Sequence, residues 1–285
     1  MCGIAGFVNS NQRVADRDLI ERMTQTLHRR GPDSQGIWTQ GPVALGHRRL
    51  SIIDVQGGSQ PMPNEDETIW VSFNGEIYNE PELREQLLIR GHQFRSQSDT
   101  ECLVHLYEDH GPDFVRFLNG MFAFAIWDIP RQKLLLSRDR MGQKPLYWHH
   151  SDGGEFLFAS EPKAILKHPA FSGDFSRERL CEFLYFEYLP FESSIWNGLQ
   201  KLRPGHSLIF ENRMVRIQRY WNPSEPLEVN SAEITDTDKL PEEFWNRFLK
   251  SVNRHQRSDV PLGVFLSGGI DSSAVAAALV EIQGS

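Results

Sequence analysis

A cysteine stands second in the chain, directly behind the initiator methionine in the sequence Met1-Cys2-Gly3. Initiator methionine is normally removed when the next residue is small, and its removal would give Cys2 a free α-amine beside its thiol. An α-amine titrates near ~7.7–8 and can serve as the general base for a nucleophile on its own residue. The alternative is a small apolar residue buried in a first β-strand, because free cysteine often packs in that way. Position alone does not separate the two interpretations.

Three further motifs carry side chains that could bind an amino acid. Arg49 lies in the segment HRRLSIID, which we predict to be a strand with arginines at its start, and a guanidinium can hold a carboxylate through two hydrogen bonds. Asn74-Gly75 is either a plain hairpin turn or an oxyanion hole built from a carboxamide and a backbone N–H. Asp99 is either a helix N-cap or an acceptor for a substrate ammonium. With Cys2, these groups describe a pocket for an α-amino acid with an acyl carbon on its side chain, and glutamine fits.

A loop rich in glycine and serine, SGGIDSS at 267–273, lies near the end of the chain. We predict a strand buried on both faces at 260–266 before it and a helix at 272–282 after it. Two glycines let the backbone approach a ligand, and a helix N-terminus offers N–H groups to an anion. The alternative is a capped helix start. The loop is not a P-loop, which needs Gly-Lys-Ser/Thr; the whole string resembles the pyrophosphate-binding loop of ATP pyrophosphatases.

The elements that must position these residues follow from short apolar runs broken by turn residues. Strands are predicted at 4–8, 43–45, 68–73, 121–127, 133–137, 146–148, 156–159 and 206–210. Helices with one apolar face are predicted at 16–28, 100–110 and 241–257. Together they indicate an α+β domain of stacked layers. The Pro-, Ser- and Asp-rich segment 222–238 is typical of a linker. Because a single strand and helix cannot bury an apolar strand, we expect the chain to be the front part of a longer protein.

Composition and charge exclude several classes of protein. The chain has 285 residues, a formal net charge of −8 and a pI near 5.7, which argue against a nucleic-acid or membrane partner. No apolar run approaches the ~20 residues of a membrane span and no signal peptide is present, so we expect a cytoplasmic protein. Cys102 and Cys181 lie in predicted helices and are interpreted as core residues rather than catalytic ones. The histidines show no metal-binding spacing, so the sequence predicts no metal site.

The order of these motifs resembles that of a known enzyme family. The class II glutamine amidotransferase domain is similar to this chain at CGI (2–4), RGPD (30–33), 49–53, NGEIY (74–78), 98–99, GMFAF (120–124), RDRMG (138–142), PLY (145–147) and 160–161. The segment SDVP (258–261), leading into SGGIDSS, resembles the start of an asparagine synthetase domain. The resemblance covers essentially the whole chain.

The resemblance implies a fold and a set of site residues. The fold is an α+β N-terminal-nucleophile αββα sandwich over 1–222, a linker over 223–239, and at 240–285 the first part of an α/β ATP-pyrophosphatase-like (adenine nucleotide alpha hydrolase) domain. In the glutaminase half, the roles carried over are nucleophile for Cys2, carboxylate contact for Arg49, ammonium contact for Asp99, oxyanion hole for Asn74 and Gly75, and pocket lining for Glu76 and the backbone around Ile53. In the second half, ATP with Mg²⁺ would be bound by Leu266, Ser267, Gly268, Gly269, Asp271 and Ser272.

The implied activity is glutamine-dependent asparagine synthesis. Glutamine would be hydrolysed through a glutamyl thioester to glutamate and ammonia, with no cofactor, and the ammonia would amidate ATP-activated aspartate. The family's second nucleotide and aspartate motif is absent, so we expect this chain alone to be competent only as a glutaminase. The partners implied are glutamine, ATP and aspartate, and a homodimer stays open. An amidotransferase acting on a glycan or peptide carboxylate, and a non-catalytic glutamine- or ATP-binding remnant, are the alternatives.

Overall fold

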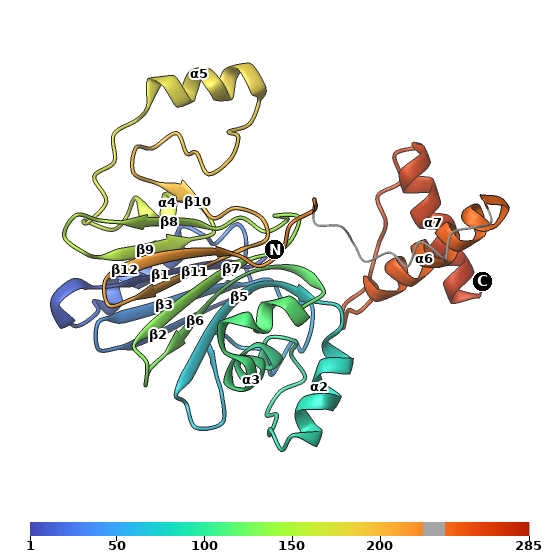
Figure 1. Ribbon diagram of the computed structural model, residues 1–285, viewed down its shortest axis with the longest axis horizontal. Coiled ribbons are helices and arrows are strands. Elements are labelled where there is room, and N and C mark those ends of the chain that lie inside the picture. The colour runs from blue at the N-terminus through green and yellow to red at the C-terminus, as the bar shows by residue number, and fades with distance from the viewer. Residues whose placement is uncertain (225–236, 285) are drawn as a thin grey trace. The chain divides into compact units, whose positions relative to one another are not determined.

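The structure, a computed structural model, describes residues 1–224 and 237–284. It divides into two compact units, Met1–Asn222 and Pro223–Ser285 (Figure 1). Most of the segment interpreted as a linker lies outside the described residues. None of the described helices is both long and apolar enough to span a membrane.

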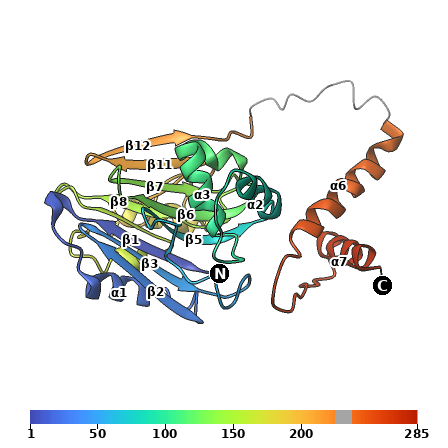
Figure 2. The same ribbon diagram turned by 90° about the horizontal axis from the view of Figure 1, so that it is seen from below.

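Two six-stranded antiparallel sheets form the middle of the first unit (Figure 2). The first sheet has the strand order β10 (Gln200–Lys201), β8 (Tyr147–His150), β9 (Phe156–Ala159), β1 (Gly3–Val8), β3 (Val43–Arg49), β2 (Ser34–Gln40). The second has the order β12 (Met214–Arg219), β11 (His206–Glu211), β7 (Lys133–Arg138), β6 (Gly120–Asp128), β5 (Ile69–Ile77), β4 (Met62–Pro63). The apolar runs predicted as strands in this unit therefore lie in strands.

The packing between the sheets follows from the alternation of side chains along each strand. In β6, Ala123, Ala125 and Trp127 pack in a core shared with Ile4 of the first sheet. The intervening aromatic and aliphatic residues of β6 point the other way, into a core beneath the helices of the outer layer. A strand apolar on both faces is what a doubly covered sheet requires.

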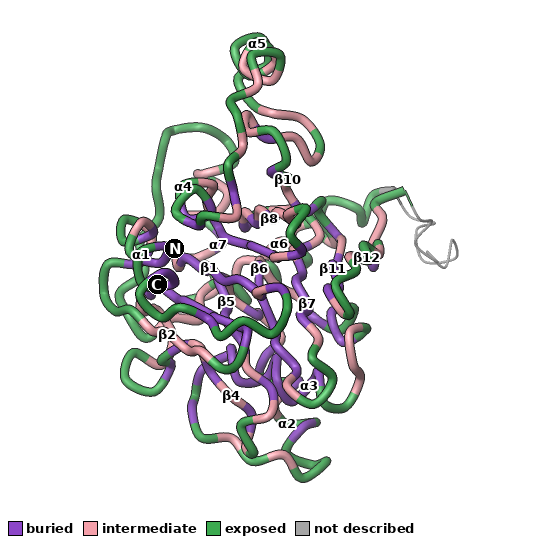
Figure 3. Tube along the Cα trace, turned by 90° about the vertical axis from the view of Figure 1, so that its left-hand side faces the viewer, coloured by how far each residue is buried: buried purple, intermediate pink, exposed green. Residues whose placement is uncertain are grey.

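Helices cover the outer face of each sheet. On the first sheet lie α1 (Arg17–Gln25) and α4 (Pro162–Ile165), and on the second α2 (Glu80–Ile89) and α3 (Glu101–His110). Helix α1 begins where the Asp16 carboxylate accepts hydrogen bonds from the N–H groups of Asp18 and Leu19, and it buries its predicted apolar face. The four layers confirm the predicted αββα sandwich. Helix α5 (Arg177–Phe186) stands outside this core and contains no buried residue (Figure 3).

Two details of the predicted elements in this unit are wrong. The segment HRRLSIID is not a strand with arginines at its start, because β3 ends at Arg49 and the residues after it form a loop. Asn74-Gly75 is not a hairpin turn, because both residues lie inside β5 and pair with Ala123 and Phe122 of β6. Local Asn-Gly chemistry is overridden here by pairing along the whole strand.

The second unit contains the helices α6 (Leu240–Arg254) and α7 (Ile270–Gln283), as predicted. They contact each other, and the Trp245 Nε1 donates to a Glu281 carboxylate oxygen at 3.0 Å. The buried strand predicted at 260–266 is wrong: these residues form no strand, and the Phe265 side chain is exposed. A strand of this kind is stabilised by paired neighbours, and the described part of this unit offers it none.

Candidate active site

A cavity of about 210 Å³ brings together the residues that the sequence assigned to glutamine. Its lining includes Cys2, Arg49, Ile53, Asn74, Gly75, Glu76 and Asp99. The pairing of β1 with β3 explains part of this, because Gly3 lies opposite Arg48 and so places the preceding cysteine beside the end of β3. Strand β5, which carries Asn74, belongs to the facing sheet. The cavity therefore lies where the ends of two stacked sheets meet.

Cys2 is half-buried and lies just ahead of β1 rather than within it. Its Sγ lies 3.7 Å from the carbonyl oxygen of Leu50 and 3.5 Å from the Leu50 nitrogen. Burial raises the pKa of the thiol, while the Leu50 backbone, the chain's amino terminus and Arg49 oppose that rise. The Arg30 Nε donates to the Cys2 carbonyl at 2.8 Å and fixes the backbone at this position. A thiol held at a cavity wall in this way is suited to attack a bound substrate.

Asn74 is almost fully buried, with 1% of its surface exposed. Its Nδ2 donor has no hydrogen-bond partner among the described residues. Such a donor is costly, by ~1–3 kcal/mol, and buried polar groups of folded proteins are rarely left without a partner. Next to it, a Cβ on Gly75 would come within 2.1 Å of the Met121 carbonyl oxygen, so only glycine fits. The arrangement leaves a donor available to an oxygen atom within the cavity.

Arg49 has a structural role that the sequence did not reveal. Its guanidinium donates to the carbonyl oxygens of Ile53 at 2.9 Å, Asp54 at 2.6 Å and Val55 at 3.1 Å. The loop that follows β3 is therefore wrapped around this side chain, which is 6% exposed and still lines the cavity. The position of the Ile53 backbone depends on the same cation that was assigned to the substrate carboxylate.

Asp99 is 4% exposed and lies just before α3. Its Oδ2 accepts a hydrogen bond from the Ile77 N–H at 2.9 Å, which ties the helix start to the end of β5. The N-cap of α3 is Thr100, so the interpretation of Asp99 as a simple helix cap is wrong. A carboxylate held in this way at a cavity wall can accept a hydrogen bond from a cationic group such as an ammonium.

Lys144 lines the same cavity and was not assigned a role by the sequence. Its side chain is buried, and burial lowers its pKa against the opposing charges of Glu76 and Asp139. The only sequence signal was its place between RDRMG and PLY, two segments that carried the family resemblance without a residue role.

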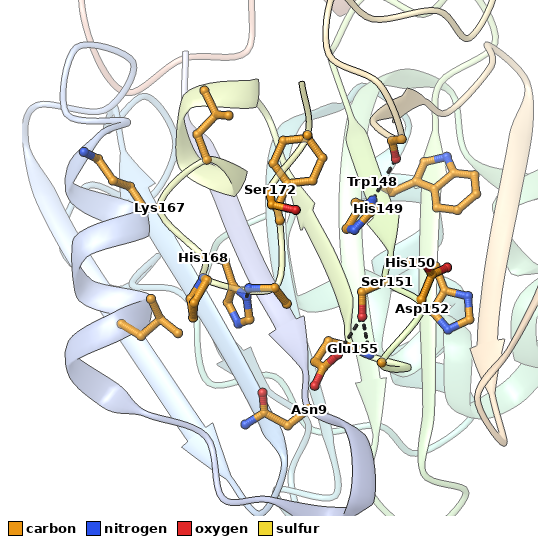
Figure 4. Close-up of a pocket in the computed structure, with 18 of the residues that line it drawn as sticks. Asn9, Trp148, His149, His150, Ser151, Asp152, Glu155, Lys167, His168 and Ser172 are labelled. Carbon is orange, nitrogen blue, oxygen red and sulfur yellow. Dashed lines mark hydrogen bonds between the residues drawn. The ribbon is translucent and has the colours of Figure 1, made fainter. Parts of the chain in front are cut away.

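A larger hollow of about 1270 Å³ lies elsewhere in the first unit (Figure 4). Its lining includes His149, Ser151, Glu155 and His168, where Ser151 donates to the Glu155 carboxylate. It contains none of the residues that the sequence assigned to glutamine or ATP. Size therefore does not identify the reactive site in this protein.

The loop Leu266–Ser272 lies in the second unit and leads into α7. Gly268 has a φ of 79°, which favours glycine, and Gly269 is the N-cap of the helix. The hydroxyls of Ser267 and Ser272 lie 3.0 Å apart, and the Ser272 hydroxyl also donates to the Gly269 carbonyl. With Asp271 in the first turn, this is the loop and helix start that the sequence predicted, although it follows an irregular segment.

Comparisons with solved structures identify the fold of the first unit. A glutamine phosphoribosylpyrophosphate amidotransferase from Bacillus subtilis, solved with ADP and GMP, matches 99% of this chain and 64% of its own, with a TM-score of 0.56 and 18% identity. A structure described as the allosteric regulatory enzyme of purine biosynthesis matches 77% of this chain and 49% of its own, with a TM-score of 0.55 and 20% identity. The first unit therefore has the fold of the amidotransferase class to which the first of these structures belongs, and Cys2 lies at its cavity.

Comparisons of sequence place the chain within that class. Residues 1–221 match the glutamine amidotransferase domain family and residues 243–285 match the asparagine synthase family. The chain belongs to the glutamine amidotransferase domain family, as the sequence resemblance implied. Asparagine synthetase [glutamine-hydrolyzing] 3 of Bacillus subtilis is 42% identical over 97% of this chain and 45% of its own length. A relative of the same name from Arabidopsis thaliana is 40% identical over 97% of this chain and 42% of its own. The chain thus spans less than half the length of these curated relatives.

Proposed function

We propose that this chain is the glutamine-hydrolysing part of a glutamine-dependent asparagine synthetase. The observation that carries the proposal is the buried Asn74 Nδ2 donor, which has no partner among the described residues and lines the cavity that contains the Cys2 thiol. An oxyanion hole requires a donor aimed at an oxygen that develops charge only during the reaction. A nucleophile and such a donor in one small cavity support acyl transfer from an amide.

The chemistry begins with removal of Met1, which exposes the α-amine of Cys2. That amine takes the thiol proton, and the sulfur attacks the side-chain amide carbon of glutamine. The carbonyl oxygen becomes an oxyanion that accepts from the Asn74 Nδ2 and the Gly75 N–H. Collapse breaks the carbon–nitrogen bond, and the protonated amine returns its proton so that ammonia leaves. Water then hydrolyses the glutamyl thioester to glutamate and restores the thiol.

Two charged side chains of the cavity wall would bind the carboxylate and the ammonium of the substrate. Arg49 would share its guanidinium between the loop carbonyls and the substrate carboxylate, and Asp99 would accept from the substrate ammonium. Both side chains are more than nine-tenths buried, and charge-assisted hydrogen bonds are strongest away from water. The cavity volume of about 210 Å³ suits a single amino acid.

The use of the ammonia is assigned to a longer protein that contains this chain. There the loop Leu266–Ser272 would bind ATP, with Mg²⁺ screening the pyrophosphate charge, and aspartate would be adenylated before amidation. The match of residues 243–285 to the asparagine synthase family and the names of the relatives support this acceptor. We place this biosynthetic protein in the cytoplasm. A glycan or peptide carboxylate as acceptor is the second candidate.

Hydrolysis of glutamine by the purified chain, and its loss in a specific variant, test the glutaminase assignment. Asp99→Asn is expected to raise the KM for glutamine by about 10–100-fold, because one charge-assisted hydrogen bond is worth ~1.5–3 kcal/mol. Asparagine can still accept from the Ile77 N–H, so the fold is kept. The measurement is glutamate release over a range of glutamine concentrations.

The matched comparison uses glutaramate, which has the same carboxamide and carboxylate but no α-amine. The unmodified protein should strongly prefer glutamine over glutaramate, and Asp99→Asn should lose most of that preference. A variant that loses activity equally on both compounds would show that Asp99 does not contact the ammonium. No glutamate release by the unmodified chain after Met1 removal, verified by intact mass, would overturn the glutaminase function itself.

The ATP assignment predicts a separate effect in the longer protein. Asp271→Ala is expected to weaken ATP binding by about tenfold or more, since this carboxylate stands in the first turn of α7 beside the proposed phosphate loop. Glu242→Ala, in the first turn of α6, is the control and should leave ATP affinity unchanged. Equal affinities for the two variants in equilibrium binding would remove the nucleotide role of the loop.

A further inference from the structure

Two histidines and two glutamates from three separate segments meet at one edge of the second sheet. Glu65 lies in the turn between β4 and β5, His92 follows α2, and His105 and Glu108 stand on α3. One ligand atom from each of them lies within 4.8 Å of all the others. The cluster shares no residue with the cavity around Cys2.

The distances within the cluster are those of a small coordination sphere. The His105 Nδ1 lies 3.2 Å from Glu108 Oε2 and 3.3 Å from Glu65 Oε2. The His92 Nδ1 lies 3.5 Å from Glu65 Oε1 and 3.6 Å from Glu108 Oε2. With metal–ligand distances of about 2.0–2.1 Å, the edge of a regular tetrahedron is about 3.3–3.4 Å. Small side-chain rotations would therefore suffice to place all four donors on one ion.

The far nitrogen of each imidazole faces a further carboxylate. The Nε2 of His92 lies within hydrogen-bond distance of an Asp109 oxygen, at 3.2 Å, whereas the Nε2 of His105 lies 3.8 Å from a Glu101 oxygen and makes no hydrogen bond among the described residues. Metal-binding histidines usually donate their other ring N–H to a carboxylate or carbonyl, which fixes the ring and its tautomer. The His92 ring, oriented in this way, presents its Nδ1 as the lone-pair donor.

The two glutamates of the cluster are themselves oriented by hydrogen bonds. The Gln93 N–H donates to Glu65 Oε1 at 3.0 Å, and the Asn64 Nδ2 donates to Glu108 Oε1 at 2.8 Å. In both residues this leaves the Oε2 atom turned toward the buried ring of His105. The side chains of Glu65 and Glu108 are 29% and 27% exposed, so the cluster is open to an ion from solvent.

We propose that Glu65, His92, His105 and Glu108 form a zinc site. Two imidazoles and two carboxylates are a donor set for zinc and its first-row neighbours, whereas Mg²⁺ and Ca²⁺ prefer oxygen alone. All four positions are filled by protein, which is the pattern of a structural rather than a catalytic zinc. The sequence alone does not reveal this site. His92 follows α2 and His105 lies on α3, so the two histidines do not have the short spacing of a metal-binding motif.

The electrostatics of the cluster favour a cation. The His105 ring lies among three carboxylates: its Nδ1 is 3.2 Å from Glu108 and 3.3 Å from Glu65, and its Nε2 is 3.8 Å from Glu101. The carboxylates thus create a strongly negative environment at the ring. A divalent ion satisfies this environment with two charges where a proton supplies one.

A bound ion would stabilise the segment that leads to the glutamine cavity. Glu101, behind His105, accepts from the N–H groups of Arg95 and Ser96. Those residues begin the stretch that ends at Asp99. Zinc would therefore join the β4–β5 turn, the α2–α3 connection and α3 into one rigid corner.

The test is zinc binding by the whole chain, produced without a histidine tag. A Cys2→Ala background is used because a terminal cysteine can itself chelate zinc. After treatment with a chelator, the protein is titrated with ZnCl₂, dialysed, and its zinc measured by mass spectrometry. The expected result is about one zinc per chain and, at a hundredfold excess over the dissociation constant, a rise in Tm of about 5–10 °C.

Two variants and one control test whether zinc binds at this cluster rather than elsewhere on the protein. His92→Gln, at a partly exposed position, should weaken zinc binding at least about 100-fold, and Asp109→Asn, behind the ring, by about 10–100-fold. His255→Gln, on the second unit, removes one imidazole without touching the cluster. Cobalt in place of zinc should give the intense visible absorption of four-coordinate cobalt. Zinc lost on dialysis, a six-coordinate cobalt spectrum, or equal losses in His92→Gln and His255→Gln would each overturn the proposal.

Discussion

Replacement of Cys2 by alanine is expected to abolish glutamate release while leaving glutamine binding in place. Removal of a nucleophile typically lowers kcat by about 10⁴-fold or more, because the covalent path is closed. Among the described residues the Cys2 thiol hydrogen-bonds only with the Leu50 backbone, so its loss should not disturb the fold. Calorimetry should show glutamine bound to Cys2→Ala with an affinity close to that of the unmodified chain.

Cys181→Ala is the matched control for this experiment. The interpretation of Cys181 as a core residue is wrong, because it is an exposed free cysteine on α5; it does not line the cavity. The Cys181→Ala variant should retain full glutaminase activity. Residual activity in Cys2→Ala equal to that of Cys181→Ala would remove Cys2 from the mechanism.

The state of the amino terminus matters to the same prediction. With Met1 present, the nitrogen of Cys2 is part of a peptide bond and cannot act as a base. Burial raises the pKa of the Cys2 thiol, which favours its neutral form before the attack. An amine that is neutral near physiological pH can accept the thiol proton at the moment of attack. Chains that keep Met1 should therefore be inactive.

The sandwich could be predicted because its signals are local. Each strand of the two sheets is a short apolar run, and the alternation in β6 directs one set of side chains between the sheets and the other beneath α3. The path of the chain around Arg49 could not be predicted in this way, because it has no local sequence signal. That guanidinium is held by carbonyls four to six residues further along, and a loop wrapped around a cation has no periodicity to detect.

The same contrast separates the two candidate sites. The cavity lined by the residues assigned to glutamine draws on distinctive motifs, although placing Asn74 within a strand required the pairing with β6. The zinc cluster was not, because His92 and His105 become neighbours only when α2 and α3 pack on the second sheet. The strand predicted at 260–266 shows the reverse case: an apolar run indicates a buried strand only where partners exist to bury it.

Replacement of Asn74 by alanine is expected to lower kcat by about 10²–10³-fold with little change in KM, because the donor acts on the oxyanion and not on the bound substrate. The free energy of unfolding should change little, for the following reason. A donor that is paired in the folded protein is costly to remove, whereas the Asn74 Nδ2 has no partner among the described residues. The measurements are steady-state glutamate release and Tm on the same preparations.

Asn197→Ala is the matched control, because Asn197 lines the larger hollow and not the cavity around Cys2. It should leave kcat unchanged. Asn74→Asp adds a second discrimination: it keeps the size of the side chain but replaces the donor by a negative charge, so its kcat should fall below that of Asn74→Ala. A loss smaller than about tenfold in both variants would contradict the oxyanion role. An equal rise in KM would instead assign Asn74 to ground-state binding, since a transition-state donor must act on kcat.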